Sequence, residues 1–215
     1  MTVTATLFRS LFAAALLAAA GLGAARPAAA AGDPDQAALM QPGPLPEETL
    51  GNPKAPVTIV EYASMTCPHC AAFDEETFPT LKKDYIDTGK VYYIFREFPL
   101  DNFATAGFVI ARCVPKDQYF AVVHAFFKEQ PELAAAPDAL KWIEDFAKQV
   151  GLTPEQTQAC LTNQKLLDDV MAVRQNAAEK LGVDSTPTFF INGKVHRGEM
   201  SVDELKATLD PLLKS

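Results

Sequence analysis

Val-Thr-Ile-Val-Glu-Tyr-Ala-Ser-Met-Thr-Cys-Pro-His-Cys, residues 57–70, decides the fold of this 215-residue chain. The β-branched and aromatic run at 57–62 predicts a buried strand, and a short loop then leads into a helix that opens at Cys67. Pro68 suits the first turn of that helix, where the missing N–H costs nothing. The sequence therefore places a Cys-x-x-Cys pair, Cys67 and Cys70, where a strand meets a helix.

The position of this pair favours redox chemistry, although the same spacing also serves zinc sites and structural disulfides. Backbone N–H groups and the helix dipole at a helix N-terminus stabilise a thiolate, so they lower the pKa of a cysteine placed there. Cys67 is thus the candidate nucleophile and Cys70, one turn further on, the candidate resolving thiol. A protonated or hydrogen-bonding His69 would favour the thiolate further. The alternative for His69 is an ordinary surface histidine.

A second apolar strand is predicted at 91–96, and it completes a strand–helix–strand unit typical of a parallel pair. Pro79 is expected to kink or split the intervening helix. Sheet signals return at 188–191 and 195–197, around a two-residue hairpin turn at Asn192-Gly193. A last helix opens at Ser201, with Glu204 as its capping partner. The fold class expected from these elements is α/β.

Residues 101–182 have helical periodicity throughout, which indicates an all-α insertion between the two halves of the sheet. Thr153 and Gln156 form the pattern of a capping box within it. Two apolar stripes are expected to face the core: Ala106, Val109, Ile110 and Cys113 in one helix, and Leu140, Ile143, Ala147 and Val150 in another.

The N-terminal region is expected to lie outside the folded domain. Residues 11–25 are an uncharged Ala/Leu-rich run after Arg9, and they are shorter than the ~20 apolar residues that a bilayer requires. Residues 1–31 are therefore expected to be a cleaved secretory signal peptide rather than a membrane span. The prolines of residues 32–56 predict an extended arm without regular structure.

Charge and cysteine content limit the classes of function. The chain has a formal net charge of −8, and loss of Arg9 and Arg26 with the signal peptide makes it more acidic still. Nucleic acid and anionic membrane surfaces are therefore poor candidate partners. Four cysteines in an exported chain would lie in an oxidising compartment, where disulfides persist.

Residues 60–70, VEYASMTCPHC, resemble the active-site segment of the DsbA-like family of bacterial thiol:disulfide oxidoreductases, within the thioredoxin superfamily. Residues 186–193, TPTFFING, are similar to the segment that carries the cis-proline facing the redox pair in that superfamily. The helical insertion between the two is also the family's pattern. The resemblance covers residues 51–213 and implies a thioredoxin-like fold with an inserted all-α helical domain. The two parts of the thioredoxin-like domain would be residues 57–100 and 183–215, and the helical insertion would be residues 101–182.

The resemblance also implies roles for individual residues. Cys67 would be the attacking nucleophile, and Cys70 would be the resolving cysteine. Pro68, Thr186 and Pro187 would contact substrate. The Thr186–Pro187 bond would be cis, whereas an ordinary turn proline is trans. Glu61, six residues before Cys67, matches an acidic strand residue that handles protons near the buried cysteine. The competing interpretation is a surface glutamate.

Cys113 and Cys160 depart from the minimal family pattern, because both lie in the helical insertion. Some relatives carry an extra disulfide there, which implies that these two are bridged; two buried free thiols are the alternative. His124 and His196 match no motif and are expected to be a packed helical residue and a surface residue.

The function expected from these features is disulfide donation to reduced exported client proteins in the periplasm. The family implies re-oxidation by a membrane quinone-linked partner. No cofactor and no metal are expected, and the arm lacks a heptad pattern, which favours a monomer. The alternatives are an isomerase or reductase, or a Cu- or Zn-binding protein that uses Cys67, His69 and Cys70.

Overall fold

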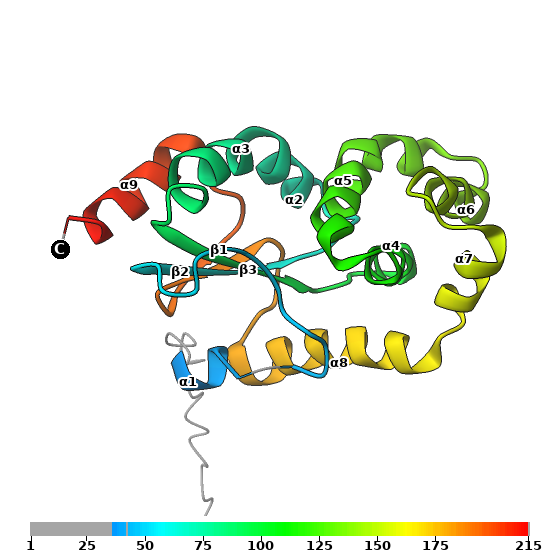
Figure 1. Ribbon diagram of the computed structural model, residues 1–215, viewed down its shortest axis with the longest axis horizontal. Helices are drawn as coiled ribbons and strands as arrows, with labels where there is room; N and C mark the ends of the chain where they lie inside the picture. The colour runs from blue at the N-terminus through cyan, green and yellow to red at the C-terminus, as the bar shows by residue number, and fades with distance from the viewer. Residues whose placement is uncertain (1–35, 42, 215) are drawn as a thin grey trace, which may run out of the picture. The chain divides into compact units, whose positions relative to one another are not determined.

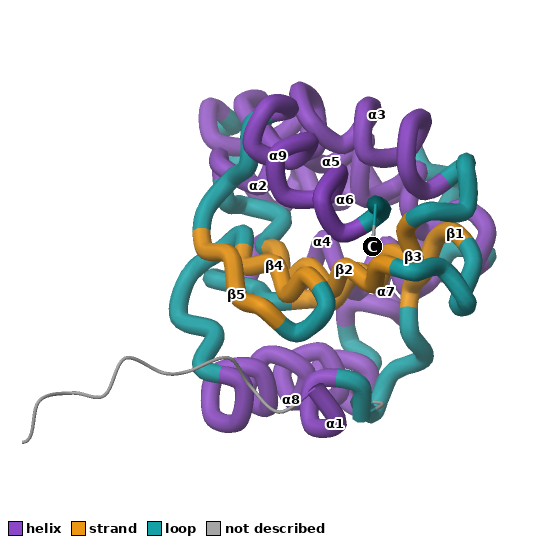
Figure 2. The backbone as a smooth tube through the Cα atoms, turned by 90° about the vertical axis from the view of Figure 1, so that its left-hand side faces the viewer, coloured by secondary structure: helices purple, strands orange, loops and turns teal. Residues whose placement is uncertain are grey.

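The computed structural model describes residues 36–41 and 43–214, so the expected signal peptide lies outside the described residues. Figure 1 shows a central sheet surrounded by helices. Within the described ranges five strands form this mixed sheet in the order β1-β3-β2-β4-β5, and Figure 2 labels all of them. Their bounds are Glu48–Gly51 for β1, Val57–Ala63 for β2, Val91–Glu97 for β3, Thr188–Ile191 for β4 and Lys194–Arg197 for β5. Strands β2 and β3 are parallel, and the other pairs are antiparallel.

Helices cover both faces of the sheet (Figure 2). One layer includes α2 (Pro68–Ala72), α3 (Phe78–Leu81) and α9 (Val202–Leu212), and the opposite layer contains α8 (Gln164–Leu181) and α1 (Gln36–Leu39). Residues on both faces of β2 are therefore buried, with Val57, Ile59 and Val60 all inaccessible to solvent. This double burial explains why the strand is a near-continuous apolar run in the sequence.

The helix after β2 is divided, as its proline predicts. After α2 the chain passes through a π-helical segment, Phe73–Thr77, then α3, then a second π-helical segment, Lys82–Ile86. Pro79 stands in the first turn of α3, where its missing N–H breaks the i to i−4 hydrogen-bond ladder.

The helical insertion lies between β3 and β4. It consists of α4 (Asn102–Cys113), a 3₁₀ turn (Lys116–Gln118), α5 (Tyr119–Ala135), α6 (Ala139–Gln149), α7 (Pro154–Leu161) and α8. The capping box of Thr153 and Gln156 is present at the start of α7. The expected position of Leu140 on an apolar stripe is wrong: this side chain lies in the first turn of α6 and is 61% exposed, whereas Ile143 and Ala147 are buried.

The expectation that residues 32–56 lack regular structure is also wrong. They contain α1 and β1, and β1 pairs with β3 so that Glu48 lies opposite Phe95. The prolines stand before and after β1 and leave its four residues free to pair. Arg112 of α4 donates to Glu48 Oε1 at 2.6 Å and to the Pro46 carbonyl at 2.7 Å, which holds the arm against the insertion.

No helix among the described residues is long and apolar enough to cross a membrane.

Candidate active site

Cys67 and Cys70 lie where the parallel strand β2 passes into α2. Cys67 is the N-cap residue of α2 with an extended backbone, and Pro68 occupies the first turn. Both cysteines are free thiols. Cys67 is 5% exposed and Cys70 is completely buried, so Cys67 is the sulfur nearer to solvent.

The two thiols have opposite acidities. The pKa of Cys67 is lowered to about 5, chiefly by a hydrogen bond with the Cys70 side chain, against the opposing effect of burial. Thr186 and the backbone N–H groups of Cys70 and His69 lower it further. Burial, followed by the interaction with Cys67, raises the pKa of Cys70 well above its ordinary value. At neutral pH the pair can therefore hold a thiolate at Cys67 beside a neutral thiol at Cys70.

The segment between α8 and β4 faces Cys67. The thiol of Cys67 donates to the carbonyl oxygen of Thr186 over 3.2 Å, and the Thr186–Pro187 peptide bond is cis. Two segments far apart in the sequence thus meet at the reactive sulfur.

His69 points away from the buried sulfurs. Its side chain is 68% exposed, and Nδ1 forms a 2.9 Å ion pair with Glu199, which lies between β5 and α9. The hydrogen bond with Glu199, followed by its charge, raises the pKa of His69, and the charge of Cys67 adds to this effect. This shift favours the protonated form of His69, and a positive charge there favours a nearby thiolate.

Glu61 is buried in β2, contrary to the alternative of a surface-facing residue. It is 2% exposed, and Tyr93 of β3 donates a 2.6 Å hydrogen bond to its Oε2. Burial raises the pKa of Glu61 to about 8, and the charges of Asp74 and Cys67 act in the same direction. The carboxyl group is consequently neutral at pH 7 and is a potential proton donor beside the cysteines.

A family comparison agrees with this geometry. A sequence profile described as "Thioredoxin" matches residues 45–211. The chain belongs to the thioredoxin family. Within it, the chain is DsbA-like: Wolbachia pipientis alpha-DsbA1 has a similar structure, with a TM-score of 0.74 and 32% identity over 82% of this chain and 94% of that one. BdbD from Bacillus subtilis has a TM-score of 0.69 and 25% identity over 86% and 97% of the two chains.

Curated relatives of this DsbA-like chain include a "putative protein-disulfide oxidoreductase" of Rickettsia conorii. It is 35% identical over 166 residues, which are 77% of this chain and 60% of the relative. The chain thus spans about three-fifths of the length of that relative.

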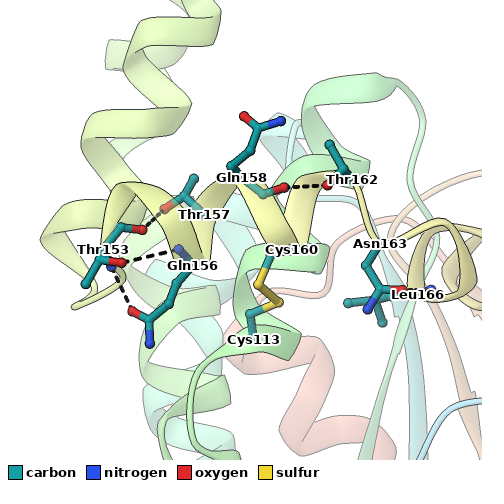
Figure 3. The surroundings of a disulfide bond; sticks show 9 residues. All are labelled: Cys113, Thr153, Gln156, Thr157, Gln158, Cys160, Thr162, Asn163 and Leu166. Atoms are coloured by element: carbon teal, nitrogen blue, oxygen red, sulfur yellow. Dashed lines mark hydrogen bonds between the residues drawn. A yellow bond between two sulfur atoms is a disulfide. The ribbon is translucent and has the colours of Figure 1, made fainter.

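The structure brings the site residues expected from the sequence of this DsbA-like chain to two locations. Glu61, Cys67, His69 and Cys70 belong to β2 and the start of α2, with Pro68 between the cysteines, and Thr186 and Pro187 face them. Cys113 and Cys160 form a disulfide that joins the end of α4 to α7 within the helical insertion (Figure 3). The alternative of two free thiols at 113 and 160 does not hold in this structure.

Three partners of the site were not found by sequence reasoning: Tyr93, which binds Glu61; Glu199, which binds His69; and Gln130, which binds the loop before Cys67. Each comes from a separate element, and no motif marks it. The apolar run at 91–96 is the only available signal, because it indicates a buried strand that contains Tyr93. His124 is a packed helical residue as expected, between the rings of Phe78 and Phe120.

Among the described residues, no group of three or more His, Cys, Asp and Glu side chains is arranged to hold a metal ion.

Proposed function

We propose that this protein is an exported thiol:disulfide oxidase that donates the Cys67–Cys70 disulfide to reduced client proteins. The observation that carries the proposal is the contrast in acidity between the two sulfurs. The pKa of Cys67 is about 5, whereas that of Cys70 lies well above its ordinary value. A disulfide is a strong oxidant when its reduced form is stabilised, and a stable Cys67 thiolate stabilises the reduced form.

The first step is attack by a client thiolate on Sγ of Cys67 in the oxidised enzyme. The Cys67–Cys70 bond breaks, a client–Cys67 disulfide forms, and the electron pair of the broken bond leaves on Cys70. The buried Cys70 has a raised pKa and therefore takes up a proton. Neutral Glu61, with its pKa of about 8, is the group of suitable acidity in β2 to supply that proton.

The second step is attack by another client thiolate on the client sulfur of the mixed disulfide. The client disulfide forms, and Cys67 departs as a thiolate. A sulfur with a low pKa is a good leaving group, so this step proceeds readily. The client has lost two electrons, and the enzyme has gained two electrons as one thiol and one thiolate.

The proposal includes the location and partners of the enzyme. Residues 1–31 would direct export to the periplasm and be removed, and the clients would be reduced exported proteins. The resemblance to DsbA-like proteins supports re-oxidation by a membrane quinone-linked partner. The enzyme would act as a monomer without a metal or cofactor, and nucleic acid would not be a partner.

The test is the reduction potential of the Cys67/Cys70 couple, measured by equilibration with glutathione, together with catalysed oxidation of reduced ribonuclease A. We expect a potential near the oxidising end of the family, about −120 mV, rather than near about −270 mV, the value for thioredoxin. A potential near the thioredoxin value would overturn the oxidase assignment in favour of a reductase.

Two further measurements address the alternatives. An isomerase would restore activity to ribonuclease A with scrambled disulfides faster than it oxidises the reduced protein. A metal-binding protein would form a tight one-to-one complex with Zn²⁺ or Cu(I) that is lost in Cys67→Ser. In the structure the imidazole of His69 is engaged with Glu199 rather than with the cysteines.

A further inference from the structure

Gln130 connects the helical insertion to the active-site loop. It lies on α5, and its Nε2 donates two hydrogen bonds, to the carbonyl oxygen of Met65 at 2.8 Å and to that of Cys67 at 3.1 Å. One amide group from the insertion thus binds the backbone on both sides of Thr66, directly before the redox pair.

One of the two carbonyls, that of Cys67, belongs to the first turn of α2, and the other, that of Met65, lies in the loop that leads into it. The Cys67 carbonyl also accepts from the backbone N–H groups of Cys70 and Ala71, at 3.1 and 3.2 Å, and so closes the first turn of α2. The N–H groups of Cys70 and His69 in that turn lower the pKa of Cys67. Any displacement of this turn would therefore change how well its donors reach the Cys67 sulfur.

Gln130 also has an electrostatic effect on this turn. Carbonyl oxygens carry partial negative charge, and their position beside a thiolate is unfavourable unless donors face them. The Nε2 group supplies such donors to two carbonyls at once. Its removal would leave both carbonyls with less compensation in the segment that carries Cys67.

Other contacts show that the insertion holds this loop firmly. Met65 is completely buried, and α4 approaches it so closely that a Cβ at Gly107 would lie 3.1 Å from the Met65 sulfur. The Thr66 hydroxyl donates over 2.7 Å to Asp101, the N-cap residue of α4. The loop is thus attached to both α4 and α5, and Gln130 is the attachment nearest to Cys67.

We propose that Gln130 is a positioning residue of the redox pair: through it, the helical insertion holds the first turn of α2 in the geometry that stabilises the Cys67 thiolate. This inference rests on the proposed role of Cys67 as the reactive sulfur. It assigns the insertion a part in setting the redox equilibrium in addition to its part in the fold.

The experiment compares Gln130→Ala and Gln130→Glu with the wild type in two measurements that need no client. One is the equilibrium with glutathione, and the other is the pH titration of the thiolate absorbance. For Gln130→Ala we expect about a fivefold shift toward the oxidised form, the size of effect of one ordinary hydrogen bond. For a two-electron couple this equals about 20 mV. The titration of Cys67 should move to higher pH.

Gln130→Glu separates this role from simple packing. The glutamate has nearly the same shape, but it places negative charge against the two carbonyls. The glutathione equilibrium should therefore shift toward the oxidised form by more than in Gln130→Ala. Gln149→Ala is the matched control, since Gln149 of α6 donates to Glu129, the neighbour of Gln130 on α5, and does not touch the loop. Its potential should equal that of the wild type.

The proposal is overturned if both Gln130 variants leave the potential and the thiolate titration unchanged, even if they lower the thermal stability. If Gln130→Ala does not fold, Gln130→Glu and Gln130→Asn provide the test. Asparagine retains the amide group, so the reduction potential of Gln130→Asn should differ from that of the wild type by less than that of Gln130→Glu. A wild-type potential near that of thioredoxin would refute the oxidase function, yet the difference between wild type and variants would still test Gln130.

Discussion

The Cys67 sulfur lies 3.2 Å from the carbonyl oxygen of Thr186, a residue 119 positions further along the chain. This contact joins the two halves of the sheet at the point where a client would approach. Cys70 lies one turn deeper and is completely buried. A client thiolate that reaches the segment of Thr186 therefore meets Cys67 first, and the order of the two chemical steps follows from this geometry.

We expect Cys67→Ala to abolish catalysed oxidation of reduced ribonuclease A, because it removes the accessible sulfur. Cys70→Ala should instead accumulate a mixed disulfide between Cys67 and the client, since the resolving thiol is missing. Non-reducing electrophoresis followed by mass spectrometry identifies the trapped species. Full turnover by Cys70→Ala, with trapping by Cys67→Ala, would reverse the assigned roles.

The reduced protein should be more stable than the oxidised protein at neutral pH. The folded pKa of Cys67 is about 5 and the unfolded value about 8.5, so the thiolate contributes stability fully above the unfolded value. The contribution is lost as pH falls through the folded pKa. At pH 7 it is on the order of 2–3 kcal/mol. The raised pKa of Cys70 opposes it only at alkaline pH, where that thiol would ionise in the unfolded chain.

Reversible denaturant titrations of the two redox forms at pH 7 and pH 4 measure this effect. The difference in the free energy of unfolding between the reduced and oxidised forms should shrink at pH 4. At that pH Cys67 of the reduced protein is largely protonated in both the folded and the unfolded state. Cys67→Ser, which cannot form the disulfide and has no acidic thiol, is the control and should lack the pH-dependent term. An oxidised form that is the more stable at pH 7 would refute the argument.

Glu61→Gln should remove a pH-dependent penalty from the folded protein. The pKa of Glu61 is raised to about 8, so the carboxyl group stays neutral in the folded protein while it ionises above about pH 4.3 in the unfolded chain; the wild type therefore loses stability as pH rises from about 4.3 to 8. The variant should therefore gain stability relative to wild type over that range, by up to a few kcal/mol. It should also form the mixed disulfide more slowly, because Cys70 loses its proton donor.

Tyr93→Phe provides the matched comparison for Glu61. The Tyr93 hydroxyl donates to the carboxylate, an interaction that lowers the pKa of Glu61, so its loss should raise that pKa further above 8. Infrared titration of the carboxyl band reports this shift directly. Identical titrations of wild type and Tyr93→Phe would show that the hydrogen bond does not control the acidity of Glu61.

The elements that sequence predicted correctly carry local signals. The β-branched strand before Cys67, the Asn192-Gly193 turn and the capping box at Ser201 each depend on a few adjacent residues, and the structure contains β2, the hairpin of β4 and β5, and α9 at those positions. The roles of Thr186 and Pro187 came instead from resemblance to a family, since nothing local marks a residue that faces a cysteine from another segment.

The elements that sequence missed depend on contacts between distant segments. Strand β1 has only four residues among prolines, and it pairs with β3 while Arg112 holds Glu48 beside it. The Gln130 contact with Cys67 joins residues 63 positions apart. A glutamine near the end of a helix carries no pattern that indicates its partner, so only the three-dimensional arrangement assigns it.

The Cys113–Cys160 disulfide should stabilise the helical insertion without affecting the redox pair. It joins α4 to α7 across a sequence separation of 47 residues, and closing such a loop reduces the entropy of the unfolded chain. In the double variant Cys113→Ala/Cys160→Ala we expect the free energy of unfolding to fall by up to about 4 kcal/mol. The glutathione equilibrium of Cys67 and Cys70 should be unchanged, because the bridge joins α4 to α7 whereas the redox pair lies at the start of α2. Mass spectrometry of non-reduced peptides checks the connectivity. A native bridge from either insertion cysteine to Cys67 or Cys70, or a shifted redox equilibrium in the double variant, would show that the two pairs are not independent.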